Sequence, residues 1–360
     1  MHLKKLLIAL TIGLSVACAG CALKSNTDTY NDTSEQSTAE ATTSRETEQA
    51  TEAETTSTEV TSEPTEETEP VSEKETTAET TEETEPSSEE QETETETASA
   101  VSDDGYFYYV DVGGMVHRTI INEEWPQTQY DKHAFSIVDK RASYSGEGYT
   151  YRLGIDVYEA YGEIDWEAVK NDGYDFAFVR IGYRGYITPS IVRDGNVFEY
   201  IAGAYEAGLD VGGYFFSQAI TEEEAIEEAE YIIELFESNF IDKERLSMGI
   251  VYDPEDISDK AARTKDLTGE QITKNALAFC ETLEEAGYKA MIYSNMVWED
   301  KNFDLGELSD YDIWYADYEG LPQTPYAFSI WQYGHGESDG VKGAVDVDIE
   351  MIPIDQEEDN

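Results

Sequence analysis

The stretch of residues 153–182, LGIDVYEAYGEIDWEAVKNDGYDFAFVRIG, contains two short apolar runs separated by a polar turn and an amphipathic segment. The runs at 153–157 and 176–182 are rich in β-branched and aromatic residues, which is typical of buried strands. Residues 166–172 carry apolar side chains at the spacing of a short helix. The stretch therefore predicts a strand, a helix and a second strand.

The same rhythm continues to residue 349. The eight predicted strands are Leu153–Val157, Phe176–Gly182, Val211–Phe216, Met248–Tyr252, Lys289–Ser294, Ile313–Tyr318, Phe328–Tyr333 and Ala344–Ile349. The predicted helices are Trp166–Asp172, Val197–Gly208, Glu222–Glu237 and Gly269–Gly287. The connections after residue 294 are too short for full helices.

Alternating strands and helices predict an α/β fold with a parallel sheet and right-handed crossovers. Eight such strands favour closure into an irregular TIM-like barrel whose last strands lack full helices. No Gly-x-Gly-x-x-Gly motif follows the first strand, which disfavours a dinucleotide-binding fold.

The amino-terminal residues 1–21 have the layout of an export signal. Lys4 and Lys5 precede the apolar run Leu6–Ala17, and small residues follow it. Cys18 and Cys21 stand in small-residue settings that resemble the lipobox of bacterial lipoproteins, so either cysteine could be lipidated. We expect export to the cell envelope with a lipid anchor; a plain cleaved signal and secretion are the alternative.

Residues 22–104 form a low-complexity segment rich in Thr and Glu, with 26 acidic residues against three basic ones. Such a segment holds too little apolar surface to build a core, and we expect a disordered linker. Residues 105–152 are expected to pack on the barrel as an extension, residues 153–354 to form the barrel, and residues 355–360 to form an acidic tail.

The charge of the chain excludes one class of partner. The formal net charge is -56, and residues 105–360 hold 53 acidic and 18 basic residues. Phosphate binding needs clustered Lys and Arg, so nucleic acid is not expected as a partner. Cys280 is the only cysteine after residue 21, which leaves the exported domain without an intramolecular disulfide, and its helical setting predicts buried packing.

Acidic residues recur where the predicted strands end, which is where barrels of this class place their active sites. The candidate catalytic residues are Asp156, Asp253, Glu255 and Asp346. Asp253 and Glu255 are two residues apart, so an extended backbone through Pro254 would point both carboxyl groups the same way. Clustered carboxylates repel one another, and at least one pKa should rise as a general acid requires. An Asp-x-Glu pair in so acidic a chain is, on spacing alone, more often solvated surface.

Aromatic and amide residues lie near these acids. The candidate substrate contacts are Arg180, Tyr183, Tyr214, Phe216, Tyr293, Trp314, Trp331 and Gln332. Rim packing is an equally good interpretation of the aromatic residues, and Arg180 is expected to pair with an acid inside the barrel. His117, His133 and His335 lack zinc-ligand spacing, so we expect neither a metal site nor a cofactor.

At these residues the chain resembles the glycoside hydrolase family 25 lysozymes. The resemblance covers residues 153 to about 350 and follows the family's order of motifs. It rests on GIDV at 154–157, GEIDW at 162–166, FAFVR at 176–180, AGLDVGGYFF at 207–216, DPE at 253–255, AGYK at 286–289, IYS at 292–294, WQY at 331–333 and GAVD at 343–346. Three positions depart from the family pattern: Tyr158 stands where serine is usual, Pro254 where an aliphatic residue is common, and Asp348 where asparagine closes the last motif.

The resemblance implies a muramidase that hydrolyses the β-1,4 bond between N-acetylmuramic acid and N-acetylglucosamine in peptidoglycan. It implies that Glu255 is the general acid and that Asp253 stabilises the substrate acetamido group as internal nucleophile, with Asp156 and Asp346 completing the site. A direct enzyme nucleophile is the competing mechanism. We expect a monomer that touches a membrane only through its anchor. The alternative function is a catalytically weak, peptidoglycan-binding surface lipoprotein.

Overall fold

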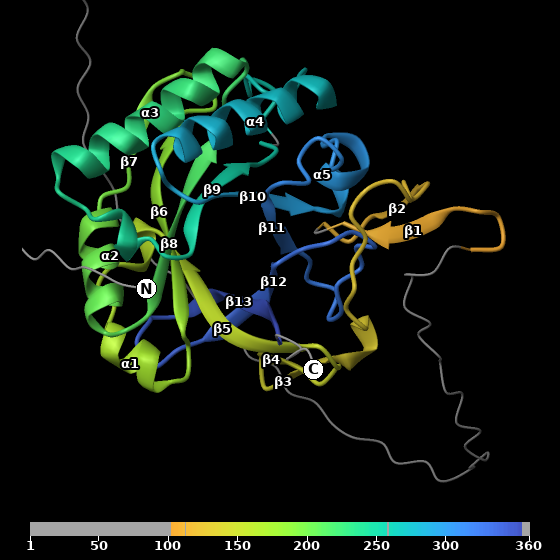
Figure 1. The fold of residues 1–360 in the computed structure, drawn as a ribbon, viewed down its shortest axis with the longest axis horizontal. Coiled ribbons are helices and arrows are strands. Elements are labelled where there is room, and N and C mark those ends of the chain that lie inside the picture. Colours follow the sequence, from red (N-terminus) through yellow and green to blue (C-terminus); the bar gives the residue numbers. More distant parts are fainter. Residues whose placement is uncertain (1–101, 112, 258, 355–360) are drawn as a thin grey trace, which may run out of the picture. The chain divides into compact units, whose positions relative to one another are not determined.

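The computed structural model describes residues 102–111, 113–257 and 259–354, all of which belong to one compact unit (Figure 1). The predicted signal, Cys18 and Cys21, the linker up to residue 101 and the tail at 355–360 lie outside the described residues. No helix in the described part is long and apolar enough to cross a membrane.

Eight strands form the barrel, and each contains or overlaps a predicted strand. They are β5 (Tyr149–Val157), β6 (Phe176–Arg184), β8 (Asp210–Ser217), β9 (Gly249–Pro254), β10 (Ala290–Asn295), β11 (Asp312–Ala316), β12 (Ile330–Glu337) and β13 (Ala344–Pro353). β5 pairs with both β6 and β13, which closes the sheet. A short strand, β7 (Ile191–Arg193), runs antiparallel to the end of β6.

The prediction of an all-parallel sheet is wrong at the last strand. β13 runs antiparallel to both of its neighbours, β12 and β5, whereas the other barrel pairs are parallel. A parallel connection needs a crossover of a dozen or more residues, and only residues 338–343 separate β12 from β13. The barrel is therefore mixed.

The predicted helices are present and lie together on one side of the barrel (Figure 1). They are α1 (Trp166–Asn171), α2 (Val197–Glu206), α3 (Glu222–Ser238) and α4 (Gly269–Glu285). The side chains of Asp165, Thr221 and Thr268 cap α1, α3 and α4 by accepting backbone N–H groups. The later connections hold only α5 (Met296–Lys301), as their length predicts. Single 3-10 turns occur at η1 (Lys132–Ala134), η2 (Glu159–Tyr161) and η3 (Lys243–Arg245).

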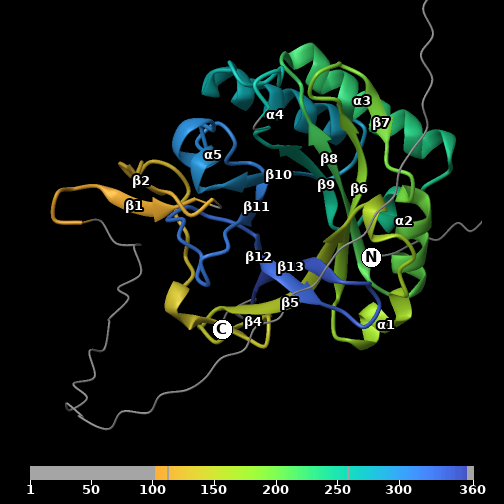
Figure 2. The same cartoon turned by 180° about the vertical axis from the view of Figure 1, so that it is seen from behind.

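The described residues before β5 contain two hairpins (Figures 1 and 2). The first joins β1 (Phe107–Val110) to β2 (Val116–Thr119), and the second joins β3 (Phe135–Val138) to β4 (Arg141–Tyr144). The Tyr109 hydroxyl donates a 2.8 Å hydrogen bond to Asp300, and the Phe135 ring lies 5.3 Å from the Trp331 ring. These contacts attach the extension to the barrel.

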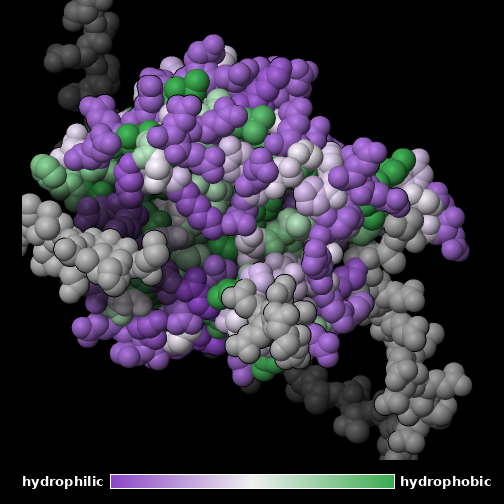
Figure 3. Space-filling model, viewed as in Figure 1, coloured by the Kyte–Doolittle hydropathy of each residue, from purple (hydrophilic) through white to green (hydrophobic). Residues whose placement is uncertain are grey.

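Buried apolar residues form two groups. The larger lies between the barrel, the helices and the extension, and includes Cys280 on α4, buried as predicted. The second fills the barrel and consists of Phe176, Phe178, Tyr214, Met248, Val251, Met291, Tyr293, Trp314, Ala316 and Ile330. Gly154 makes room for this filling, because a Cβ there would overlap the Phe176 ring. The outer surface seen in Figure 3 is mainly hydrophilic, in keeping with the charge of the chain.

Candidate active site

The predicted catalytic carboxyl groups meet at one end of the barrel, where the parallel strands finish. Asp156 is the second-last residue of β5, and Asp253 is the second-last residue of β9. Asp346 lies near the start of β13, opposite Asp156, because β13 runs in the reverse direction. Glu255 follows Pro254, the last residue of β9, and is half-buried. Asp156 and Asp253 are only 6% and 4% exposed, so both carboxyl groups are largely removed from water.

Burial and mutual repulsion raise the pKa values of this cluster. The pKa of Asp156 lies well above its usual range because of burial and the negative charges of Asp348 and Asp346. Burial and the Glu255 charge raise the pKa of Asp253, while Arg180 opposes that rise. Burial, Asp346 and Asp256 raise the pKa of Glu255. The cluster therefore holds protons that isolated carboxyl groups would release.

One amide orients Asp156. Gln332 on β12 donates a 2.7 Å hydrogen bond from Nε2 to Asp156 Oδ2. Its Oε1 accepts the Tyr318 hydroxyl at 2.7 Å and the Tyr293 hydroxyl at 3.5 Å. Donors on Oε1 fix the amide so that its N–H faces the carboxylate. Gln332, 5% exposed, thus acts on Asp156 directly, which is a different role from the predicted substrate contact.

Arg180 pairs with an acid, as predicted from its place in the barrel. Its Nε and Nη2 each lie 2.9 Å from Asp194 Oδ2, and the Asp194 side chain is fully buried. The guanidinium also lies over the rings of Tyr158 and Tyr183, 4.5 and 5.4 Å from their centroids. This places a fixed positive charge beside Asp253, where it favours the carboxylate.

The predicted aromatic contacts fall into a floor and a rim. Trp314 is in the floor: it stacks on Phe178 at 4.9 Å and donates Nε1–H to Asp348 Oδ1 at 2.8 Å. Tyr214 and Tyr293 pack edgewise on Trp314, and both are under 10% exposed. Tyr183 and Phe216 are half-buried at the ends of β6 and β8, on the rim.

The prediction of Trp331 as a substrate contact is wrong. Side chains alternate along a strand, so Gln332 can face the barrel only if Trp331 faces away. Trp331 is fully buried against Phe135 of the extension, and its Nε1–H donates to the Asp317 carbonyl at 2.8 Å. Its aromatic surface is therefore used in packing.

Four residues at this end of the barrel were not among the predicted site residues. Trp314 and Ala316 face the inside of the barrel, and Tyr318 follows at the same spacing of two residues and contacts Gln332. That spacing could have identified Tyr318 from the sequence. Asp348 is fully buried below Asp346, and its Oδ2 has no hydrogen-bond partner. Tyr161 donates its hydroxyl to Asp346 at 3.3 Å.

His335 is the fourth, and its place follows from the antiparallel β13. His335 and Asp346 are direct partners across β12 and β13, and Nδ1 lies 2.5 Å from Asp346 Oδ1. A β13 that ran parallel to β12 would not have placed these two residues opposite each other. Within residues 102–111, 113–257 and 259–354, no group of three or more His, Cys, Asp or Glu side chains is arranged to hold a metal ion.

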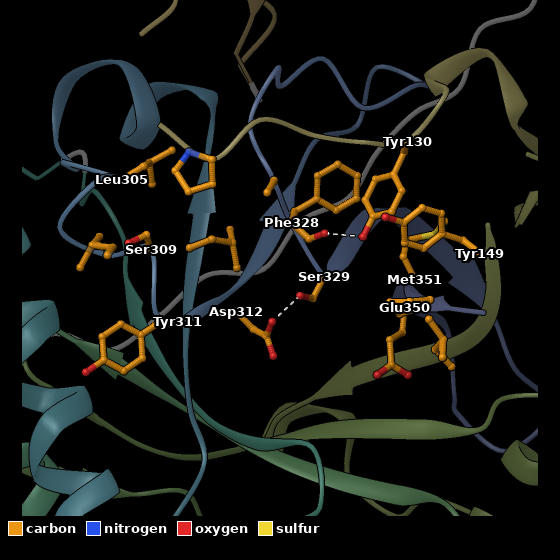
Figure 4. A pocket seen from close by; sticks show the side chains of 16 residues that line it. Tyr130, Tyr149, Leu305, Ser309, Tyr311, Asp312, Phe328, Ser329, Glu350 and Met351 are labelled. Carbon is orange, nitrogen blue, oxygen red and sulfur yellow. Dashed lines mark hydrogen bonds between the residues drawn. The ribbon is translucent and has the colours of Figure 1, made fainter. Parts of the chain in front are cut away.

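A separate cavity of about 450 Å³ opens at the other end of the barrel (Figure 4). Tyr130, Tyr149 and Phe328 line it, together with Asp312 and Glu350. Both acids already have partners: Asp312 accepts the Ser329 hydroxyl and pairs with Lys289, and Glu350 pairs with Arg152. The cavity contains none of the clustered carboxyl groups, so we place the chemistry at the opposite end.

The chain is similar in sequence to an autolytic lysozyme. It is 25% identical over 197 residues to the autolytic lysozyme of Clostridium acetobutylicum, a match that covers 54% of each chain. The chain therefore spans about half the length of that relative.

The solved structures that are similar to this chain include two examples. One is the modular autolysin LytC of Streptococcus pneumoniae in complex with a synthetic peptidoglycan ligand, with a TM-score of 0.49, 21% identity, and coverage of 69% of this chain and 57% of that one. The other is a family 25 glycosyl hydrolase from Bacillus anthracis, with a TM-score of 0.44, 22% identity, and coverage of 60% of this chain and 94% of that one.

The family assignment comes from sequence. The sequence profile of the glycosyl hydrolases family 25 matches residues 155–341, which is just over half of the chain and includes Asp156, Asp253 and Glu255. The chain belongs to the glycosyl hydrolases family 25.

Proposed function

We propose that the barrel is a muramidase, which hydrolyses the β-1,4 bond between N-acetylmuramic acid and N-acetylglucosamine in peptidoglycan. The observation that carries the proposal is the juxtaposition of Asp253 and Glu255 in a buried carboxyl cluster at the strand ends. Family membership and the name of the autolytic lysozyme relative support the choice of substrate.

Glu255 is assigned as the general acid. Its pKa is raised by burial, Asp346 and Asp256, which keeps the carboxyl group protonated in the range where a glutamate is usually ionised. Arg180 favours the ionised form of Asp253, whereas Asp346 and Asp256, the charged residues that shift the pKa of Glu255, are both acidic. Burial raises the pKa of both acids, and Glu255 is the half-buried member of the pair, so its carboxyl group is the one placed to meet the leaving oxygen of a bound sugar.

Asp253 is assigned to the substrate acetamido group. Its Oδ1 is buried and has no hydrogen-bond partner, so it can accept the acetamido N–H of a bound sugar. The acetamido oxygen of that sugar would attack the anomeric carbon as the bond to the leaving oxygen breaks and Glu255 protonates that oxygen. The Asp253 carboxylate would stabilise the cyclic cation that forms, and water, giving its proton to Glu255, would then open it to the product. Asp156 and Asp346 lie opposite each other across β5 and β13 and complete the carboxyl cluster at the same centre. Direct attack by a carboxylate is the competing mechanism.

Product analysis tests the proposal. Purified peptidoglycan is digested, the products are reduced with borohydride, and the new reducing ends are identified by mass spectrometry. Reduced N-acetylmuramic acid ends support the muramidase. Reduced N-acetylglucosamine ends would assign the wrong bond, and binding without new ends would support the alternative, a surface binding protein.

The Glu255→Gln variant tests the assigned acid. We expect its turnover to fall by roughly 100-fold or more, the usual scale for losing a general acid. Glu244→Gln, which changes an exposed glutamate on η3, is the matched control and should keep wild-type turnover. Wild-type turnover in Glu255→Gln would show that another group supplies the proton.

We further propose that the protein is exported and held at the cell envelope by a lipid on Cys18 or Cys21, with residues 22–104 as the connection to the barrel. The folded region is too acidic to be retained by anionic wall polymers through charge. Replacing both cysteines by Ser should release active enzyme to the medium with its rate on purified peptidoglycan unchanged. A double variant that stays on cells after a high-salt wash would contradict the anchor.

A further inference from the structure

The main chain of Glu255 is held by a buried amide that lies outside the carboxyl cluster. Gln218 directly follows β8, whose last residue, Ser217, is paired with Pro254 of β9. Gln218 is 1% exposed, and its Nε2 donates a 2.9 Å hydrogen bond to the carbonyl oxygen of Glu255. The side chain thus bridges the two strands one residue beyond the last pair of their ladder.

The other bonds of this amide fix its orientation. Its second Nε2–H donates to the Ser217 carbonyl at 2.9 Å, and its Oε1 accepts the Thr264 hydroxyl at 3.1 Å. With one partner on Oε1 and one on each N–H, rotation of the amide by 180° would break all three bonds. The N–H that meets Glu255 is therefore held in one direction.

Gln218 is itself fixed to the rest of the protein by an ion pair. Arg263 donates to the Gln218 carbonyl at 3.1 Å and holds Glu224 through both terminal nitrogens, at 2.9 and 2.6 Å. Glu224 lies in the first turn of α3 and also accepts the Ile220 N–H at 2.9 Å. The bidentate pair is a strong and directional contact, so the connection between β9 and α4 is tied to the end of β8.

We infer that Gln218 is a positioning residue for Glu255: it fixes the peptide of Glu255 and so the direction of its carboxyl group. This inference rests on the proposed muramidase only for the chemistry of Glu255. Proton transfer needs the acid within hydrogen-bond reach of the leaving oxygen, and a displacement of about 1 Å can cost on the order of 100-fold in rate. Gln218 touches no reacting atom and acts through Glu255.

The test compares two buried amides of the same kind. Gln218→Met keeps the length of the side chain and removes its hydrogen bonds. The matched control is Asn275→Leu, because Asn275 is also fully buried and donates from Nδ2 to a backbone carbonyl, that of Ala219, at 2.9 Å. Both substitutions remove a buried amide that donates to a backbone carbonyl, but Asn275 lies on α4 and bonds to the connection after β8, and only Gln218 contacts Glu255.

Turnover is measured on peptidoglycan fragments at a temperature where both variants are folded. We expect Gln218→Met to lower kcat by roughly 10- to 100-fold with KM within about twofold, and Asn275→Leu to keep kcat within about threefold. The alkaline limb of the kcat profile should move in Gln218→Met only. Wild-type kcat and limb in Gln218→Met, or equal losses in both variants, would overturn the inference.

A second measurement separates this inference from the proposed function. The pKa of the Glu255 carboxyl group is followed by carbon-detected NMR titration in the wild type and in both variants. A shift confined to Gln218→Met supports positioning even if the wild type releases no muramic acid ends, a result that would reject the muramidase alone. An unchanged Glu255 titration in Gln218→Met overturns the inference whatever the activity.

Discussion

Gln332 Nε2 lies 2.7 Å from Asp156 Oδ2, so a side chain of β12 reaches across β13 to hold a carboxylate of β5. The bond joins residues 176 positions apart in the chain. It is a hydrogen bond to a buried acid, which makes it stronger than a neutral one if the acid is ionised. The closure of the barrel therefore brings the Gln332 amide to Asp156, where its hydrogen bond opposes the rise in the pKa of that acid.

Gln332→Met should impair the site through Asp156. The Gln332 hydrogen bond lowers the pKa of Asp156, whereas burial and the neighbouring acids raise it. Removing the amide should therefore raise that pKa further. Hydrogen bonds to charged groups are worth about 1.5–3 kcal/mol, so we expect kcat/KM to fall by roughly 10- to 100-fold. Initial rates on peptidoglycan fragments across a range of pH values check this.

The control for that variant is Gln323→Met. Gln323 is another buried amide bonded to a carboxylate, with Nε2 3.1 Å from both oxygens of Asp317, but it lies outside the carboxyl cluster. It should lower thermal stability and leave kcat close to that of the wild type. Equal rate losses in the two variants would indicate a general effect of removing a buried amide.

The pH profile should report the raised pKa of Glu255. A general acid works only while protonated, so activity is present at low pH and falls as pH rises through the pKa of Glu255. The alkaline limb should therefore lie above the usual range of a glutamate. Asp256→Asn removes one of the charges that raise this pKa and should move the limb to lower pH, by a fraction of a pH unit because Asp256 is exposed. Asp259→Asn, in the same connection, is the control, and a limb that moves upward in Asp256→Asn would refute the assignment.

Asp348→Asn should stabilise the fold at neutral and alkaline pH. Asp348 is fully buried, its Oδ2 has no partner, and burial and the Asp346 charge raise its pKa well above the usual range. An acid whose pKa is raised by folding favours the folded state at low pH, and that contribution is lost as pH rises. Asparagine keeps an acceptor for Trp314 Nε1 and carries no charge.

We expect Asp348→Asn to gain on the order of 1–3 kcal/mol in unfolding free energy at pH 8 and little at pH 4, measured by urea titration. The pKa of Asp156 should fall, because the Asp348 charge is among the causes that raise it. A variant less stable than the wild type at pH 8 would show that the ionised Asp348 carboxylate has a stabilising partner, and would contradict this prediction.

Glu299, which lies outside the carboxyl cluster, should also make the free energy of unfolding depend on pH. Burial raises its pKa to about 8, its Oε2 accepts the Thr324 hydroxyl at 2.5 Å, and its Oε1 has no partner. Unfolding returns it to an ordinary glutamate, so stability should fall as pH rises from about 4.5 to 8 and change little above. At about 1.4 kcal/mol for each pKa unit, the loss amounts to roughly 3–5 kcal/mol.

Glu299→Gln should flatten that slope and leave kcat unchanged. Unfolding free energies from urea titrations at several pH values between 4 and 9 measure it. If the wild type and the variant show parallel curves, Glu299 is ionised in the folded protein and its environment is more polar than its burial indicates.

The sequence alone determined the elements and the acids. Runs such as 153–157 and 176–182 are apolar because both faces of a barrel strand are buried, and this pattern is local. The grouping of Asp156, Asp253 and Glu255 could also be predicted, since the carboxyl ends of parallel barrel strands meet at one face. Asp346 joins them only because β13 is antiparallel. The helices followed from the spacing of their apolar residues.

Only the tertiary structure decided which side chains meet. The direction of β13 depends on the length of one connection, and that direction pairs His335 with Asp346. Trp331 and Gln332 are neighbours in sequence, but the face that each occupies depends on the register of β12, which assigns one to packing and the other to Asp156. No sequence pattern marks Gln218, and its contact with Glu255 exists only because β8 and β9 are paired. The apolar pattern of a strand can be read from a few consecutive residues. Hydrogen bonds between distant side chains depend on strand register and barrel closure, which are properties of the whole barrel.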